Sequence, residues 1–169
     1  PQGTNLTVNV YSRSPQVRLY LNDKLIDTKA TSATFWAGFT VPYEAGVLKA
    51  VEYDGKEEGA SFILKTTSTP VGIRLVTDRS NLVSDGNDLA YVTAELVDEE
   101  GQVVYDSQRA INFTVEGEGK IIACGNACPN DMESFRNPSP KLYNGRAQTI
   151  IQTTKNAGEF TVKVTSDNL

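Results

Sequence analysis

The chain has 169 residues, with 16 basic and 21 acidic side chains, a net charge of −5 and no histidine. Hydrophobic residues make up 39% and charged residues 22%, the balance of an ordinary globular protein. The acidic balance, without a basic cluster, disfavours nucleic acid as a partner. No apolar run approaches the roughly 18 residues of a membrane-spanning helix. The absence of histidine excludes Ser-His-Asp and Cys-His catalysis and His-ligated zinc.

The first part of the chain alternates apolar and polar residues in short runs, a pattern that predicts strands with one buried face. Asn22-Asp23 predicts the tight turn of a hairpin. The expected strands are residues 6–10, a hairpin over 16–28, and residues 34–40, 47–53 and 60–65. Residues 1–67 therefore predict a small β-sandwich, followed by a polar linker at residues 68–70.

The second part repeats the alternation with turn clusters about every ten residues, the spacing of an immunoglobulin-like sandwich. Its expected strands are residues 72–78, 89–97, 102–105, 110–116, 119–124, 145–153 and 159–165. One cluster, Asp85-Gly86-Asn87-Asp88, has the composition of a calcium loop but lacks EF-hand ligand spacing, which favours a plain turn. The predicted fold is all-β, with two tandem antiparallel β-sandwiches, the second spanning residues 71–169.

A segment of about twenty residues, 125–144, interrupts this regular spacing with three prolines and no clear strand. Loops of that length inside compact domains are usually functional or packed against a neighbour. Its polar residues suit contact with a sugar or a neighbouring domain, and they are Asn126, Asn130, Asp131, Glu133 and Arg136. The alternative is that Met132 and Phe135 insert into the sandwich while the polar groups cap backbone, and the sequence favours this packing interpretation.

The two cysteines, Cys124 and Cys128, are four positions apart in the same region. A two-thiolate metal site would need two more ligands, and no other cysteine or histidine exists to supply them. We therefore expect no metal site. Two free thiols and one short-ring disulfide both remain open, and export would favour the disulfide.

Three aromatic residues near one strand form a second candidate site. Trp36, Phe39 and Tyr43 would make a sugar-stacking platform if they shared one exposed face, because aromatic rings pack against the apolar faces of pyranose rings. Aromatic residues on a short strand are more often part of a core. Trp36 and Tyr43 are thus candidates for sugar stacking, with the core as the favoured interpretation.

Several motifs carry a resemblance to glycoside hydrolase family 2, and the resemblance covers nearly the whole chain. The first part resembles the small β-sandwich that follows the catalytic barrel in bacterial β-galactosidases, on the segments 10–12, 17–24 and 41–51. The second part is similar to the invasin-type immunoglobulin-like domain of the same enzymes, on the segments 78–80, 85–92, 117–122, 133–135 and 143–147.

This resemblance implies that the chain is a non-catalytic C-terminal module pair of an exported enzyme, located in the periplasm or at the cell surface. Family 2 enzymes hydrolyse glycosides with retention, using two glutamates on an upstream barrel. Those glutamates have no matching positions here, so we expect no catalytic, cofactor-binding or metal-binding residues. The expected partner is the catalytic barrel of the same parent chain, and an oligosaccharide is a second candidate partner. A glycan-binding module and the stalk of a cell-surface adhesin are the alternative functions.

The end of the chain carries one further expectation. Family members usually continue past the segment that matches Thr165–Leu169 with one more strand. Without that strand the second sandwich has an open edge, which is prone to pairing with another chain. We therefore expect the edge to be covered by a contact, or the chain to associate.

Overall fold

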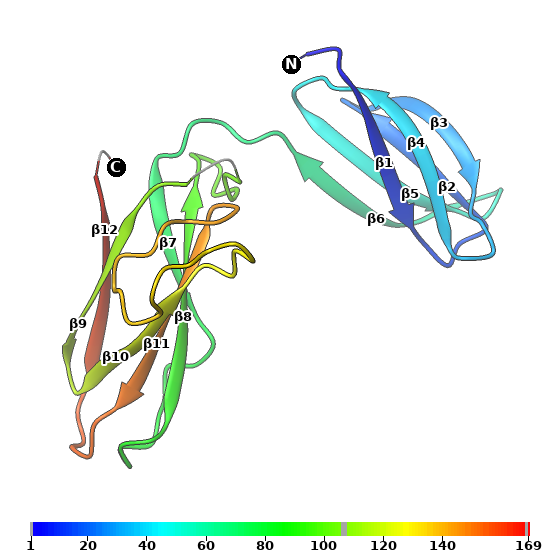
Figure 1. Cartoon of the computed structure of the whole chain (residues 1–169). Helices are drawn as coiled ribbons and strands as arrows, with labels where there is room; N and C mark the ends of the chain where they lie inside the picture. The colour runs from blue at the N-terminus through cyan, green and yellow to red at the C-terminus, as the bar shows by residue number, and fades with distance from the viewer. Residues whose placement is uncertain (1, 106–107, 168) are drawn as a thin grey trace. The chain divides into compact units, whose positions relative to one another are not determined.

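The computed structural model describes residues 2–105, 108–167 and 169, and every regular element in these ranges is a β-strand (Figure 1). The chain divides into two compact units, residues 1–66 and 67–169. The all-β class predicted from the sequence is confirmed. Within the described ranges, no helix is present that is long and apolar enough to cross a membrane.

The first unit is built from six antiparallel strands. They are β1 (Asn5–Tyr11), β2 (Gln16–Leu21), β3 (Lys24–Ala30), β4 (Trp36–Pro42), β5 (Val47–Tyr53) and β6 (Glu58–Lys65). One sheet has the order β3-β2-β5-β6, and the other pairs β1 with β4. The turn between β2 and β3 places Asn22 and Asp23 at φ values of 49° and 62°, as a two-residue hairpin turn requires.

The core of the first unit lies between these two sheets. The inward residues of β2 and β4 alternate with outward ones and are almost completely buried, and they are Val17, Leu19, Leu21, Ala37, Phe39 and Val41. Because successive side chains of a strand point to opposite faces, the remaining residues of β4 lie on the outer face of its sheet.

The second unit also has six strands. They are β7 (Gly72–Thr77), β8 (Leu89–Val97), β9 (Ile111–Gly117), β10 (Gly119–Gly125), β11 (Arg146–Thr153) and β12 (Phe160–Ser166). Four form a sheet in the order β10-β11-β8-β7, and β12 pairs with β9 in the other. The buried core between the sheets includes Leu96, Ile111 and Phe113.

The prediction of a strand at residues 102–105 is wrong. Val103 forms an isolated bridge with Val97, and no strand runs through this segment. The burial of two neighbouring side chains explains this absence, because Val103 and Val104 are both only 8% exposed. Two consecutive inward side chains do not fit the alternation of a regular strand.

One side of the second sandwich is open. Among the described residues, β12 has β9 as its one paired neighbour. Beside β12, a groove of about 570 Å³ lies between the sheets, and its lining includes Leu75, Val92, Phe160 and Val162. Apolar side chains of three strands therefore line this groove, and Leu75, Phe160 and Val162 are half-buried there.

Candidate functional site

The segment between β10 and β11 follows the edge of β9 in its second half (Figure 1, yellow to orange). The backbone N–H groups of Ile111 and Phe113 donate to the carbonyl oxygens of Pro140 and Pro138, at 3.1 and 2.9 Å. Leu142 is only 1% exposed and packs into the core. This half of the loop is thus part of the sandwich and covers one of its edges.

The first half is held by the side chain of Asn126. Its Nδ2 donates to Asp131 Oδ2 at 2.7 Å and to the carbonyl of Lys141 at 3.0 Å, and its Oδ1 accepts from the N–H of Cys128 at 2.9 Å. Asp131 Oδ1 accepts in turn from the N–H of Glu133 at 2.9 Å. Two of the predicted polar site residues, Asn126 and Asp131, are therefore in direct contact and fix the backbone of the loop.

Met132 and Phe135, the two residues expected to insert into the sandwich, face solvent. Met132 is 95% exposed and Phe135 is 71% exposed, so the prediction that they insert into the sandwich is wrong. The backbone explains the position of Phe135, because its carbonyl accepts from the N–H of Cys124 at 2.7 Å. Its ring lies against Gly125, where a Cβ would come within 3.1 Å of the ring carbons. The polar groups do bind backbone, as the packing interpretation expected.

A groove of about 640 Å³ at the base of the loop brings most of the predicted polar residues together. Its lining includes Asn126, Asn130, Asp131, Glu133 and the side chain of Met132. The fifth predicted residue, Arg136, is exposed and does not line this groove. The groove combines amide and carboxylate groups with one thioether, which suits contact with a partner surface more than a chemical reaction.

Both cysteines are free thiols in this structure. Cys124 is buried and its Sγ donates to Thr149 Oγ1 at 3.3 Å, while Cys128 is half-buried in the loop. Burial raises the pKa of the Cys124 thiol, which keeps it protonated and unreactive. Across residues 2–105, 108–167 and 169, no group of three or more Cys, Asp or Glu side chains is arranged to hold a metal ion.

The structure separates the three aromatic residues proposed as a platform. Phe39 is 2% exposed and belongs to the core. Trp36 begins β4 and Tyr43 follows its last residue, so they are roughly 20 Å apart along the strand. Trp36 is 40% exposed, but Tyr43 lies beyond the other end of β4 and does not stand beside it as a second stacking ring.

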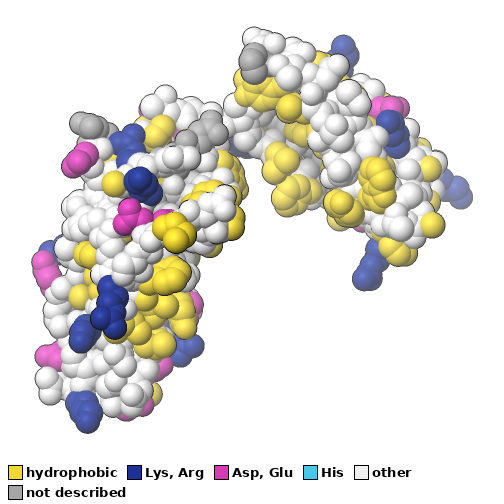
Figure 2. Space-filling view, in the orientation of Figure 1, with side chains coloured by type: hydrophobic (Ala, Val, Ile, Leu, Met, Phe, Trp, Pro, Cys, Tyr) yellow, Lys and Arg dark blue, Asp and Glu magenta, His cyan; other side chains and the backbone are white. Residues whose placement is uncertain are grey.

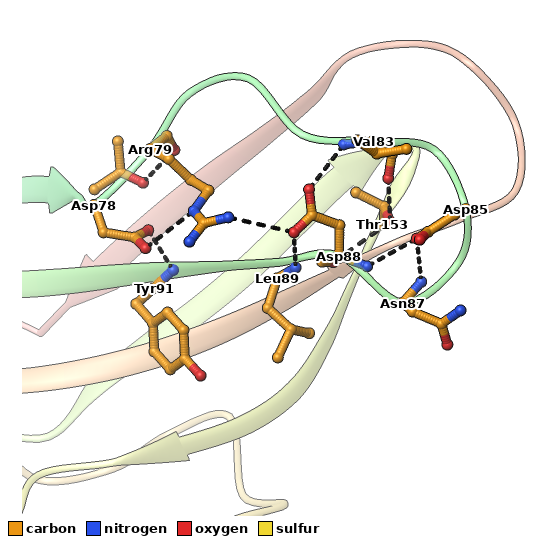
Figure 3. A network of polar contacts seen from close by, with 10 residues as sticks. Asp78, Arg79, Val83, Asp85, Asn87, Asp88, Leu89, Tyr91 and Thr153 are labelled. Atoms are coloured by element: carbon orange, nitrogen blue, oxygen red, sulfur yellow. Dashed lines mark hydrogen bonds and ion pairs between the residues drawn. The ribbon is translucent and has the colours of Figure 1, made fainter.

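A polar network surrounds the loop between β7 and β8 (Figure 3). Asp78 Oδ1 accepts from the N–H of Tyr91 at 2.8 Å, and Asp88 Oδ2 accepts from the N–H of Val83 at 2.8 Å. Arg79 lies between the two carboxylates, with Nε 3.3 Å from Asp78 Oδ2 and NH1 3.4 Å from Asp88 Oδ1. The two carboxylates thus form hydrogen bonds with backbone N–H groups and ion pairs with one guanidinium.

The cluster Asp85-Gly86-Asn87-Asp88 forms a turn, as the sequence favoured. Asp85 Oδ1 accepts from the N–H groups of Asn87 and Asp88 at 2.7 and 3.0 Å, and Gly86 has a φ of 80°. Side-chain capping of the backbone two residues on is the usual role of aspartate in turns. Thr153 Oγ1 donates to the carbonyl of Val83 at 3.0 Å and ties the loop to β11.

Comparisons with known proteins agree with this fold. The model of the glycoside hydrolase family 2 C-terminal domain 5 matches residues 73–169, and a domain of unknown function, DUF4982, matches residues 3–59. A family 2 glycosyl hydrolase of Bacteroides cellulosilyticus DSM 14838 has a structure similar to this chain, with a TM-score of 0.96 and 34% identity. This alignment covers 99% of this chain and 23% of that protein.

Two curated proteins show the same relationship. A β-galactosidase of Bacteroides ovatus is 32% identical over 160 residues, and a β-glucuronidase of Formosa agariphila is 29% identical over 119 residues. These alignments cover 94% and 68% of this chain but only 19% and 12% of the relatives. The chain thus spans less than a quarter of the length of the curated relatives it matches.

These findings define a tandem pair of all-β domains that corresponds to a small part of much longer glycosidases. The chain belongs to the glycoside hydrolase family 2 C-terminal domain 5 family, and the resemblance drawn from its turn and strand motifs is confirmed.

Proposed function

We propose that the chain is the non-catalytic C-terminal module pair of an exported bacterial family 2 glycoside hydrolase that acts on β-galactosides or β-glucuronides. The family match and the relatives named as a β-galactosidase and a β-glucuronidase support this assignment. In this proposal the catalytic barrel lies upstream in the parent chain, and the two sandwiches stabilise it or border its entrance. Export to the periplasm or cell surface rests on the family resemblance.

The observation that carries the contact with the barrel is the loop between β10 and β11. It presents Met132, 95% exposed, and Phe135, 71% exposed, on a backbone that Asn126 holds in place. Apolar side chains on an ordered loop lose little conformational entropy when a partner buries them. Asn130 and Asp131 supply the polar rim that such interfaces have.

The test uses the full-length parent enzyme with Met132→Ser and Phe135→Ser combined. We expect faster thermal inactivation or a lower kcat/KM for a chromogenic β-galactoside, because full burial of each apolar side chain is worth about 1.5–3 kcal/mol. The matched control is Phe62→Ser, which removes an aromatic side chain that is 69% exposed on β6, outside the loop. This control should leave both measurements unchanged.

A second variant, Asp131→Ala with Arg136→Ala, examines the polar rim. The same substitutions in the isolated 169-residue chain separate loss of the interface from unfolding of the loop, since only the full-length enzyme contains the barrel. If both loop variants leave the stability and kcat/KM of the full-length enzyme unchanged, the contact with the barrel does not exist.

A further inference from the structure

The outer face of the β1–β4 sheet carries an aromatic and polar surface that the core does not use. The two strands pair antiparallel, and the outward positions form four cross-strand pairs. These pairs are Asn5 with Pro42, Thr7 with Thr40, Asn9 with Gly38, and Tyr11 with Trp36. Seven of these residues have side chains that are uncharged at neutral pH and the eighth is glycine, in a protein of which 22% of residues are charged. Figure 2 shows hydrophobic side chains exposed on the face of the first unit turned to the viewer, where Figure 1 draws β1 and β4.

Gly38 allows the indole of Trp36 to lie along this face. A Cβ added to Gly38 would come within 2.8 Å of Cζ3 of Trp36, so the indole occupies the space above the glycine. The side chain nevertheless keeps 40% of its surface exposed. Part of the ring system therefore remains available to a ligand, held in one orientation by the strand beneath it.

A second aromatic ring and an amide flank the indole. Tyr11 lies directly opposite Trp36 on β1 and is 74% exposed. Asn9 is exposed opposite Gly38, with its Oδ1 3.5 Å from the position that a glycine Cβ would take. The face thus has two aromatic rings at one end and hydrogen-bonding amide and hydroxyl groups along the rest of its length, roughly 20 Å.

The residue before Trp36 adds strain to the same end of the sheet. Phe35 has a φ of 61° and is 57% exposed. A bulky aromatic residue is unfavourable in the left-handed region, and such strain clusters at functional sites. The fold therefore maintains an unfavourable backbone conformation at an exposed aromatic residue that directly precedes Trp36.

We propose that this outer face of β1 and β4 binds a neutral oligosaccharide, with the indole of Trp36 and the ring of Tyr11 stacked on sugar rings. The apolar C–H faces of pyranose rings pack on aromatic faces, and the amide of Asn9 bonds sugar hydroxyl groups. The outward side chains carry no charge, and the ammonium of Lys29 on β3 donates to the backbone carbonyl of Gly38 at 2.8 Å. A face whose own side chains are uncharged favours a neutral ligand over an acidic one or a charged protein surface. This inference concerns the first unit alone and does not depend on any contact between the chain and a barrel.

The structure corrects the platform predicted from the sequence. Trp36 is retained, but Tyr11 replaces Tyr43 and Phe39 as the aromatic partner. The register of β1 against β4 makes the difference, because it places Tyr11 directly opposite Trp36.

The experiment uses the 169-residue chain and its intrinsic fluorescence. Trp36 is the chain's sole tryptophan, so any change in indole emission reports on this face. The probes are cellohexaose, xylohexaose, mannohexaose and galactohexaose, with a hexamer of galacturonate as the charged comparison. We expect at least one neutral hexaose to shift or quench the emission in a saturable way at millimolar concentration, and the charged hexamer to have no effect.

Calorimetric titration of variants with the hexaose that binds then assigns the contact. Trp36→Ala should abolish binding, and Tyr11→Ala should weaken it by about tenfold or more. Gly38→Ala retains the indole but displaces it from the sheet, so it should also weaken binding by a comparable factor. The matched control is Phe62→Ala, which removes an exposed aromatic side chain from β6 and should leave the affinity unchanged.

Three results would overturn the proposal. The first is that none of the neutral hexaoses changes emission or produces heat at millimolar concentration. The second is that binding persists in Trp36→Ala or is unaffected by Gly38→Ala. The third is that the emission change follows protein concentration without sugar, which would assign the face to association between copies of the chain.

Discussion

Two aspartates of the second unit, Asp78 and Asp88, accept hydrogen bonds from backbone N–H groups through their charged carboxylates. The N–H of Tyr91 chiefly lowers the pKa of Asp78, and the N–H of Val83 chiefly lowers the pKa of Asp88. A carboxylate whose folded pKa lies below its unfolded value of about 3.9 stabilises the fold above that value. The contribution is lost as pH falls through the folded pKa, because the protonated form binds these donors less well.

We therefore predict that the free energy of unfolding of the second unit decreases as pH falls below about 4. Asp88→Asn should be less stable at pH 7, because the ion pair with Arg79 and part of the backbone capping are lost. It should also lose less stability than the wild type on acidification, since one titrating group is removed. Urea denaturation at neutral and acidic pH measures both effects, and equal acid sensitivity in the two proteins would contradict the assignment.

At the scale of single elements, the turn that precedes β11 depends on a left-handed pair. Asn144 and Gly145 have φ values of 48° and 74°, and the backbone groups of Tyr143 and Arg146 bond each other at 2.9 and 3.0 Å on either side. A Cβ on Gly145 would lie 2.2 Å from the carbonyl oxygen of Val104. An Asn-Gly pair is the typical solution for this tight hairpin turn.

Gly145→Ala should accordingly destabilise the second unit by about 1–3 kcal/mol through backbone strain alone, with the clash adding to it. The matched control is Gly72→Ala, because Gly72 has no positive φ and nothing within 4 Å of its Cβ position. Urea denaturation of both variants provides the measurement. A Gly145→Ala midpoint equal to that of Gly72→Ala would mean that the turn relaxes without cost.

The sequence predicted elements better than it predicted contacts between them. The interpretation that aromatic residues on a short strand belong to a core holds for Phe39, which is buried, but not for Trp36, which is 40% exposed. The pairing of Tyr11 with Trp36 joins strands 25 positions apart, and local pattern does not specify that register. Prediction from the sequence was limited in the same way for the loop between β10 and β11. Its length signalled a special role, but the local pattern did not show that Met132 is exposed or that Asn126 bonds the backbone of Lys141, 15 positions away.

At the scale of the whole molecule, the second sandwich has an open side along β12. Next to β12, the inward side chains of Leu75, Val92 and Val162 line a groove of about 570 Å³. Unpaired backbone groups at a sheet edge, beside partly buried apolar side chains, form a template for another strand. The expectation drawn from the sequence, that this edge is covered or that the chain associates, therefore has a defined location.

We predict that the purified 169-residue chain associates through β12 as its concentration rises. Light scattering coupled to size-exclusion chromatography should show a mass that increases with loading. Thr161→Lys combined with Thr165→Lys adds two charges at exposed positions of β12, and edge lysines oppose strand pairing, so this variant should stay monomeric. The control is Thr40→Lys, at an exposed position on β4 of the first unit, which should associate like the wild type. A wild-type chain that remains monomeric at all concentrations would show that the open edge of β12 is tolerated in solution.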